Sequence, residues 1–266
     1  MSPARVYTPE VREPEAMAAL HQALGVERVV IVHPNTHGTD NSVTLYGMKA
    51  RGANSRGIAL IDDATSDRDI EALTQSGMRG ARINLRLRHG DENDTAGGRR
   101  QFQALVRRIA KHGWHLQMFT SLAVIKAIRD LVQECPVPVV FDHFGGLDAS
   151  LGLDQPGFAD LLDLIRSGKA YVKLSAAYRS SAQPPDYPDV APFAHALIAA
   201  NPDRVLWGSD WPHPTGVTPP GRKPTDVTPM LQIDDLRLFN QLPVWAPDAA
   251  ICEKILVHNP VRLYGF

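Results

Sequence analysis

The sequence has little cysteine, almost no net charge and no long hydrophobic run. Cys135 and Cys252 are its two cysteines, too few for a disulfide framework or a cysteine-based zinc site. The formal net charge of -1 gives no electrostatic basis for binding nucleic acid or an acidic membrane. No apolar run approaches the roughly 20 residues that span a bilayer, and no signal peptide is visible. We therefore expect a cytoplasmic protein with neither nucleic acid nor a membrane as partner.

Linker-like segments are also lacking. The 21 prolines and 20 glycines are spread along the chain, and no low-complexity segment separates one part from another. With 266 residues, 44% of them hydrophobic, the chain is long enough to bury one large core. These features predict a single domain over residues 1–266 and leave the oligomeric state open.

What the sequence does contain is an alternation of short apolar runs with helical patterns. This alternation is typical of βαβ units and a parallel sheet. It predicts an α/β fold, a distorted (β/α)8 TIM barrel that lacks its first strand. A doubly wound open sheet is the alternative, but its Gly-rich first turn is absent. The predicted strands cover residues 29–32, 58–61, 80–85, 114–119, 137–141, 171–174 and 205–207, and the longer helices cover about 15–24, 66–75, 98–111, 122–132, 158–165, 190–200, 229–238 and 249–257.

Polar residues gather where the predicted strands end, which is where α/β barrels build their sites. Asp210 follows an apolar run that stops at Gly208, and burying such a carboxylate without a partner is costly. Each candidate also has a structural interpretation, as a helix cap, an ion-pair partner or a buried histidine with its hydrogen bonds satisfied. The candidates are His33, Asn35, His37, Asp62, Arg82, Asn84, Arg86, Arg88, Gln117, His143, Lys173, Ser175, Asp210, Trp211 and His213.

Several arginines occur near these strand ends. Arg82, Arg86 and Arg88 lie in and after one predicted strand, and Arg179 follows another. Because a guanidinium binds carboxylate through two hydrogen bonds, this group predicts a small anionic substrate, most simply a polycarboxylate. The alternative is a solvated loop in which the arginines pair with the acidic residues of segment 91–94.

Two of the candidates are expected to face each other across the mouth of the barrel. His143 and Asp210 could activate water by general base catalysis, or they could be two ligands of a divalent metal such as zinc or manganese. A catalytic zinc normally takes three protein ligands, and no His-x-His pair near a strand end completes the set. Ser175 and Ser209 do not lie in a nucleophile elbow, so acyl-enzyme chemistry is disfavoured.

Several motifs together resemble the amidohydrolase superfamily, in the branch called amidohydrolase family 2. Within that branch the chain is similar to the 2-pyrone-4,6-dicarboxylate lactonases. The matching pieces span nearly the whole chain: GSDWPHP at 208–214, HNPVRLYG at 258–265, Ser2-Pro3 with Tyr7, HGTDN at 37–41, GMRG at 77–80 with Arg82, Asn84 and Arg88, GWH at 113–115, Val137-Pro138 with Asp142-His143, and Lys173 and Arg179.

The resemblance implies a distorted TIM barrel that hydrolyses a lactone ring. Asp210 would be the general base for the attacking water, and His143 would help to polarise the lactone carbonyl. The superfamily is mostly metal-dependent, but the lactonase type implies a reaction that requires no cofactor, with zinc or manganese at His143 and Asp210 as the alternative. The substrate-binding residues implied are Arg82, Arg88, Arg179, His37, Asn35 and Tyr7.

Three departures from the family pattern keep other readings open. The first-strand His-x-His motif has no counterpart, so either the start was assigned too late or the barrel lacks that strand. Residues 5–7 are the only candidate for a substitute. Phe119 stands where a tyrosine is expected and Asn35 where a serine is expected, so a sugar-acid or muconate lactone is also considered. The alternatives are a metal-dependent hydrolase or decarboxylase, and a truncated barrel without activity.

Overall fold

A computed structural model describes residues 1–85 and 94–266 of the chain. The described chain divides into two compact units, which are considered separately. The first unit comprises residues 1–82 and 210–236, and the second comprises residues 83–209 and 237–266. A single domain over 1–266 therefore stays a prediction. Arg86 and Arg88, together with most of the acidic loop expected to face them, lie outside the described residues.

Seven strands of the described chain form one sheet, and its order follows the sequence from β2 to β8. The recorded pairs are parallel, and this order of strands confirms the predicted α/β barrel-type fold. All seven predicted strands are present within a few residues of their expected bounds. The strands are β2 (Val29–Val32), β3 (Ser55–Ala59), β4 (Met78–Asn84), β5 (His115–Phe119), β6 (Val139–Phe141), β7 (Ala170–Ser175) and β8 (Val205–Gly208).

The segment considered as a substitute for an earlier strand does not join this sheet. Two residues next to it form β1 (Thr8–Pro9), which pairs in parallel with β9 (Val227–Thr228) as a separate two-stranded sheet. The Thr8 hydroxyl anchors β1 further, because it donates a 2.7 Å hydrogen bond to the carbonyl of Pro224. The N-terminal segment is thus attached to the long loop that follows Asp210, within the first unit.

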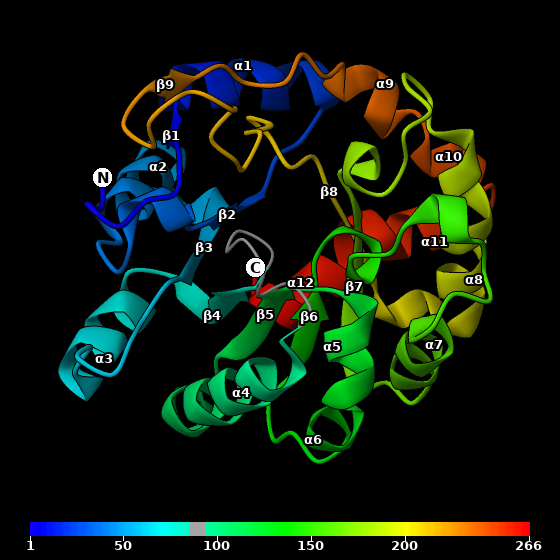
Figure 1. The fold of residues 1–266 in the computed structure, drawn as a ribbon, viewed down its shortest axis with the longest axis horizontal. Helices are drawn as coiled ribbons and strands as arrows, with labels where there is room; N and C mark the ends of the chain where they lie inside the picture. The colour runs from blue at the N-terminus through cyan, green and yellow to red at the C-terminus, as the bar shows by residue number, and fades with distance from the viewer. Residues whose placement is uncertain (86–93) are drawn as a thin grey trace. The chain divides into compact units, whose positions relative to one another are not determined.

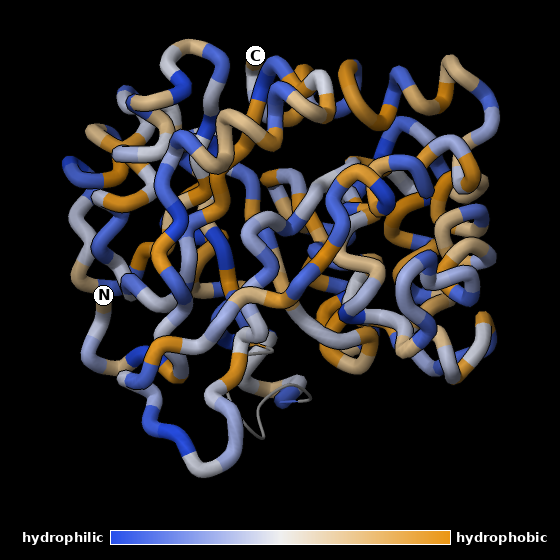
Figure 2. Tube along the Cα trace, turned by 90° about the horizontal axis from the view of Figure 1, so that it is seen from above, coloured by the Kyte–Doolittle hydropathy of each residue, from blue (hydrophilic) through white to orange (hydrophobic). Residues whose placement is uncertain are grey.

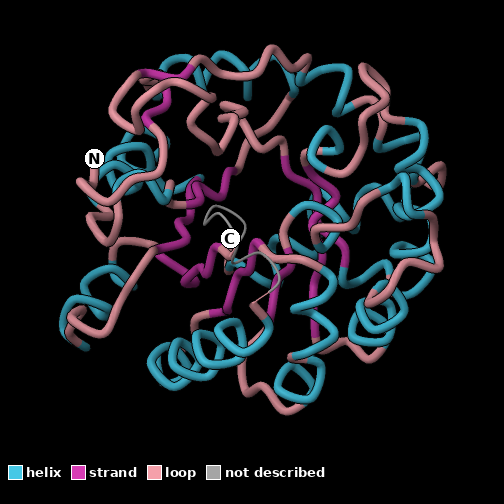
Figure 3. Tube along the Cα trace, viewed as in Figure 1, coloured by secondary structure: helices cyan, strands magenta, loops and turns pink. Residues whose placement is uncertain are grey.

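Helices follow most strands of the sheet, as the alternation predicted. In the second unit, the helices from α4 to α8 flank strands β5 to β8 (Figures 1 and 3). The helices are α1 (Pro14–Leu24), α2 (Ser42–Arg51), α3 (Asp67–Gln75), α4 (Thr95–Ile109), α5 (Leu122–Ala127), α6 (Arg129–Gln133), α7 (Phe158–Arg166), α8 (Ala191–Ala200), α9 (Asp235–Phe239), α10 (Leu242–Trp245), α11 (Ala249–Glu253) and α12 (Asn259–Tyr264).

One predicted helix is wrong over its first half. The pattern at 229–238 predicted a helix, but α9 begins only at Asp235. The backbone N–H of Leu231 donates a 2.9 Å hydrogen bond to the carbonyl of His213, in the loop after Asp210. The backbone of this first half is therefore tied to the loop after Asp210 and is not helical.

Helix α12 packs against the amino ends of strands in the second unit. Tyr264 of α12 is 3% exposed, and its ring lies 5.3 Å from the ring of His115, the first residue of β5. The Asn259 side chain donates 2.8 Å hydrogen bonds to the carbonyls of Pro202 and Val205, next to the start of β8. These contacts cover the amino ends of the strands, so the opposite ends remain for chemistry.

Hydrophobic and hydrophilic residues alternate along the described trace (Figure 2). No helix among residues 1–85 and 94–266 combines the length and apolar character that a membrane span needs.

Candidate active site

Three neighbouring strands of the second unit bring Phe119, His143 and Ser175 together at their carboxyl ends. The Nδ1 atom of His143 lies 2.8 Å from the Oγ atom of Ser175. The Phe119 ring is perpendicular to the imidazole, with 4.7 Å between the ring centroids. His143 is 8% exposed and Ser175 is 5% exposed, so this imidazole is held on two sides with little contact with solvent.

Arg179 lies next to this histidine cluster. It ends the short 3-10 turn Ala177–Arg179, which directly follows β7. Its Cζ atom lies 5.9 Å from the centroid of the Phe119 ring and 5.2 Å from that of Tyr178. Aromatic faces attract a guanidinium and restrict its orientation. The Arg179 guanidinium and the hydrogen-bonded His143 imidazole therefore both lie close to the Phe119 ring.

Beneath the cluster, a buried polar network joins the same three strands. The Lys173 ammonium lies 3.0 Å from Oδ1 of Asp142, and the Gln117 amide donates a 2.9 Å hydrogen bond to Oδ2 of the same carboxylate. Their exposures are 9% for Lys173, 3% for Asp142 and 1% for Gln117. We expected Lys173 and Gln117 among the site candidates, whereas Asp142 was noted only as part of a motif. Its position directly before His143, at a strand end, was the available signal.

In the first unit, His33 is a structural histidine. Its Nε2 lies 2.8 Å from the carbonyl of Gly38, which can only accept, and its Nδ1 lies 2.8 Å from the Thr44 hydroxyl. The ring therefore donates through Nε2 and accepts through Nδ1. Burial lowers the pKa of His33 to about 4, so the ring is neutral at neutral pH. His33 is therefore a buried histidine whose hydrogen bonds are satisfied within the structure.

Three other predicted binding residues, Arg82, Asn35 and His37, lie at the end of β2. Arg82 donates a 2.7 Å hydrogen bond from Nη1 to the backbone carbonyl of His33. Asn35 and His37 lie on the 3-10 turn Asn35–His37, and the His37 ring lies 6.3 Å from the His33 ring. Burial lowers the pKa of His37. The Asn35 Oδ1 atom is buried and has no hydrogen-bond partner among the described residues, and Tyr7 is 4% exposed.

Asp210 begins a tightly constrained loop of the first unit. Asp210 and His213 have positive φ angles of 62° and 63°, and the Trp211–Pro212 peptide bond between them is cis. The N–H of His213 donates a 3.0 Å hydrogen bond to the Asp210 carbonyl. Non-glycine residues with positive φ are costly and cluster at functional sites. Asp210 is half-buried.

The side chain of His213 is held by a carboxylate that the sequence did not single out. Its Nε2 lies 3.1 Å from Oδ2 of Asp235, at the start of α9, and His213 is 3% exposed. Both residues line a cleft of about 210 Å³ in the first unit, together with Trp211 and Arg12. The loop is thus secured through backbone and side chain. No sequence pattern indicated Asp235, since its partner is 22 positions away.

The described residues form no group of three or more His, Cys, Asp or Glu side chains that could hold a metal ion. His143 and Asp210, the two predicted candidate ligands, belong to no such group within 1–85 and 94–266. His143 belongs to the second unit and Asp210 to the first.

A family model described as Amidohydrolase matches residues 1–266, the full length of the chain. The chain belongs to the amidohydrolase family. This confirms the resemblance inferred from the strand-end motifs, and it makes the protein a hydrolase.

Characterised relatives of this amidohydrolase carry the names of lactone hydrolases. It is 37% identical to a 4-sulfomuconolactone hydrolase of Rhizobium radiobacter, over 98% of this chain and 83% of the relative. It is 34% identical to a 2-pyrone-4,6-dicarboxylate hydrolase of Comamonas testosteroni, over 99% and 84%. A crystal structure titled as a putative 2-pyrone-4,6-dicarboxylic acid hydrolase from Pseudomonas putida superposes with a TM-score of 0.80 at 28% identity, over 98% of this chain and 91% of that one.

Proposed function

We propose that this amidohydrolase opens the lactone ring of a small anionic substrate, of the kind represented by 2-pyrone-4,6-dicarboxylate. The observation that carries the proposal is the cluster of Arg179, Phe119 and His143. A cation and a hydrogen-bonded imidazole that share the Phe119 ring as neighbour suit a substrate that has both a carboxylate and a carbonyl group. The names of the relatives support the same class of reaction. Related muconate or sugar-acid lactones are the other substrates to include in an assay.

The proposed reaction is addition of water to the lactone carbonyl. Asp210 takes a proton from the attacking water as its oxygen bonds to the carbonyl carbon. The carbon–oxygen bond of the ring then breaks, and the proton passes from Asp210 to the leaving ring oxygen. His143 donates a hydrogen bond to the carbonyl oxygen as negative charge develops there. Arg82, Arg88 and Arg179 bind the carboxylates of the substrate, and His37, Asn35 and Tyr7 complete the binding residues.

We further propose that this reaction needs no metal. The support is the resemblance of the strand-end motifs to the lactonase type, which implies a reaction without a cofactor. Zinc or manganese held by His143 and Asp210, for a hydrolase or decarboxylase reaction, is the alternative, because much of the superfamily works in that way. Hydrolysis after exhaustive chelation separates the two. Activity that is lost on chelation and restored by zinc or manganese would refute the metal-free proposal.

Arg179 provides the sharpest test of the substrate class. We expect Arg179→Met to lower kcat/KM on a dicarboxylate lactone by roughly 10- to 100-fold, since a hydrogen bond to a charged group contributes about 1.5–3 kcal/mol. On a lactone without carboxylates, the same variant should match the parent protein. The control is Arg166→Met, which removes an exposed arginine of α7 in the same unit. Equal losses on charged and uncharged lactones would contradict carboxylate recognition by Arg179.

A further inference from the structure

The His143 ring is contacted by side chains from both neighbouring strands. It contacts Phe119 from the preceding strand and Ser175 from the following strand. Phe119 belongs to β5 and Ser175 to β7, and both strands pair directly with β6. The register runs from Leu116↔Val139 to Met118↔Phe141 with β5, and from Val139↔Ala170 to Phe141↔Val172 with β7. The strand register therefore delivers both contacts to the same imidazole.

The backbone on both sides of the hydrogen bond is held in a sparsely populated conformation. His143 has φ 51° and Phe144 has φ 55°, and Ala176, the residue after Ser175, has φ 51°. None of these is a glycine, so each carries a steric cost that the surrounding structure must offset. Non-glycine residues in this conformation cluster at functional sites, so their presence at both ends of one buried hydrogen bond points to a role for that bond.

The chemistry of the two groups says what this geometry achieves. A serine hydroxyl both donates and accepts, whereas the neutral imidazole donates through one nitrogen and accepts through the other. If the Ser175 hydroxyl donates to Nδ1, the proton of the neutral ring lies on Nε2. If His143 takes up a second proton, the hydroxyl can rotate and accept from Nδ1–H instead. One side chain can therefore support His143 in both protonation states.

We propose that Ser175 is a positioning residue for His143, which holds the ring through Nδ1 and directs an Nε2–H toward the lactone carbonyl. This inference rests on the proposed function, because it assumes that His143 polarises that carbonyl. Ser175 forms no bond with substrate and transfers no group. It acts through the imidazole, as an outer hydrogen bond does when it sets the tautomer and orientation of a functional histidine.

Nitrogen-15 NMR of the histidine-labelled protein tests the inference without any substrate. The His143 signals are assigned by difference from His143→Gln. We expect the parent protein to show the neutral ring with its proton on Nε2 and with Nδ1 as the hydrogen-bonded acceptor. A neutral ring that carries its proton on Nδ1 would overturn the proposal, and this result would not depend on whether the protein hydrolyses lactones.

Two variants extend the test to turnover. Ser175→Ala removes the hydroxyl, and we expect a mixture of His143 tautomers and a fall in kcat of about 10-fold, the loss for one hydrogen bond of ordinary strength, with KM within about twofold. Ser175→Thr keeps the hydroxyl and should restore the Nε2–H tautomer and most of kcat. An Ala variant with parental tautomer and parental kcat would refute the role. A parent protein with the expected tautomer but no lactonase activity would refute the proposed function and leave the positioning intact.

Discussion

The buried pair of Lys173 and Asp142 makes the strongest prediction about stability. Lys173→Met leaves the Asp142 carboxylate, 3% exposed, with the Gln117 amide but without its ammonium partner. Removing one member of a buried ion pair costs about 3–5 kcal/mol, because the remaining charge stays desolvated. Met has a similar length to Lys, so little packing volume is lost. We therefore expect a loss of roughly this size in the free energy of unfolding.

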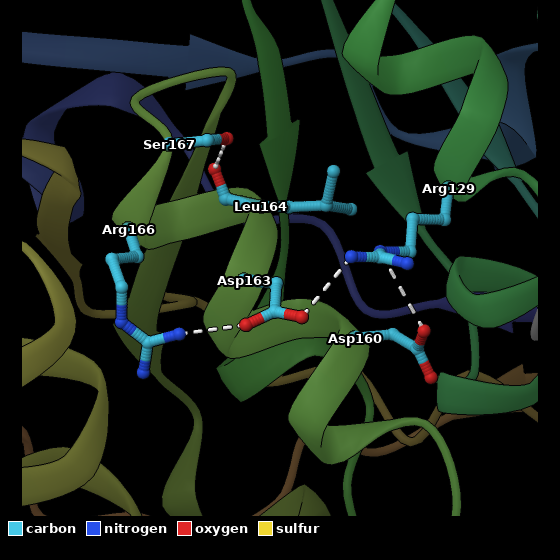
Figure 4. A network of polar contacts seen from close by, with 6 residues as sticks. All are labelled: Arg129, Asp160, Asp163, Leu164, Arg166 and Ser167. Atoms are coloured by element: carbon cyan, nitrogen blue, oxygen red, sulfur yellow. Dashed lines mark hydrogen bonds and ion pairs between the residues drawn. The ribbon is translucent and has the colours of Figure 1, made fainter.

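Urea unfolding of the parent and variant measures this loss, and the network on α7 supplies the control. Arg166 lies 59% exposed beside Asp163, which also pairs with Arg129 at 3.1 Å (Figure 4). Arg166→Met should cost less than about 1 kcal/mol, since exposed ion pairs contribute little. If Lys173→Met destabilises the protein no more than Arg166→Met does, the reasoning about the buried pair is wrong.

Two further predictions concern a histidine and a glycine. In the folded protein the pKa of His33 is about 4, below its usual 6.5. The contribution of His33 to the free energy of unfolding should therefore be constant above pH 6.5 and fall by about 3 kcal/mol as the pH is lowered to 4. Urea titrations across this range should show a shallower fall for His33→Gln. Gly146 has φ 73°, and a Cβ there would lie 1.9 Å from the Thr120 carbonyl oxygen, whereas Gly152 at φ 72° has open space. Gly146→Ala should therefore lower the melting temperature much more than Gly152→Ala does. The second change should lower the free energy of unfolding by about 1 kcal/mol. Similar melting temperatures for the two variants would refute the steric argument.

The order of the sheet was predictable because its signal is local. Runs such as Val29–Val32 are continuous and β-branched, which indicates buried strands. The helical patterns between these runs act as crossover connections, and such connections predict a parallel sheet. The bounds of α9 were not predictable, because the stretch before it is held by a backbone hydrogen bond from Leu231 to His213, 18 positions earlier in the chain. Local periodicity carries no information about such a contact.

The candidate site divides in the same way. The position of His143 at a strand end was visible in the sequence, since the apolar run before it stops there. The hydrogen bond between Ser175 and His143, by contrast, depends on the register between two strands, and register is a tertiary property. His33 has the same local signal as His143 but proves to be engaged on both nitrogens, by Thr44 and Gly38. Strand-end position therefore identifies candidates, and only the tertiary contacts of a side chain show a structural role such as that of His33.

The central claim is that this amidohydrolase opens a carboxylated lactone with Asp210 as general base. The most direct measurement is the rate of hydrolysis of 2-pyrone-4,6-dicarboxylate, and of muconate and sugar-acid lactones in parallel. The rate is measured for the parent protein after its metals are removed with a chelator, and for Asp210→Asn. The account predicts turnover that survives chelation and falls by at least about 100-fold in the variant, as expected for loss of a general base. An Asp210→Asn variant that turns over at the parental rate, or a parent protein that opens none of these lactones, would contradict it.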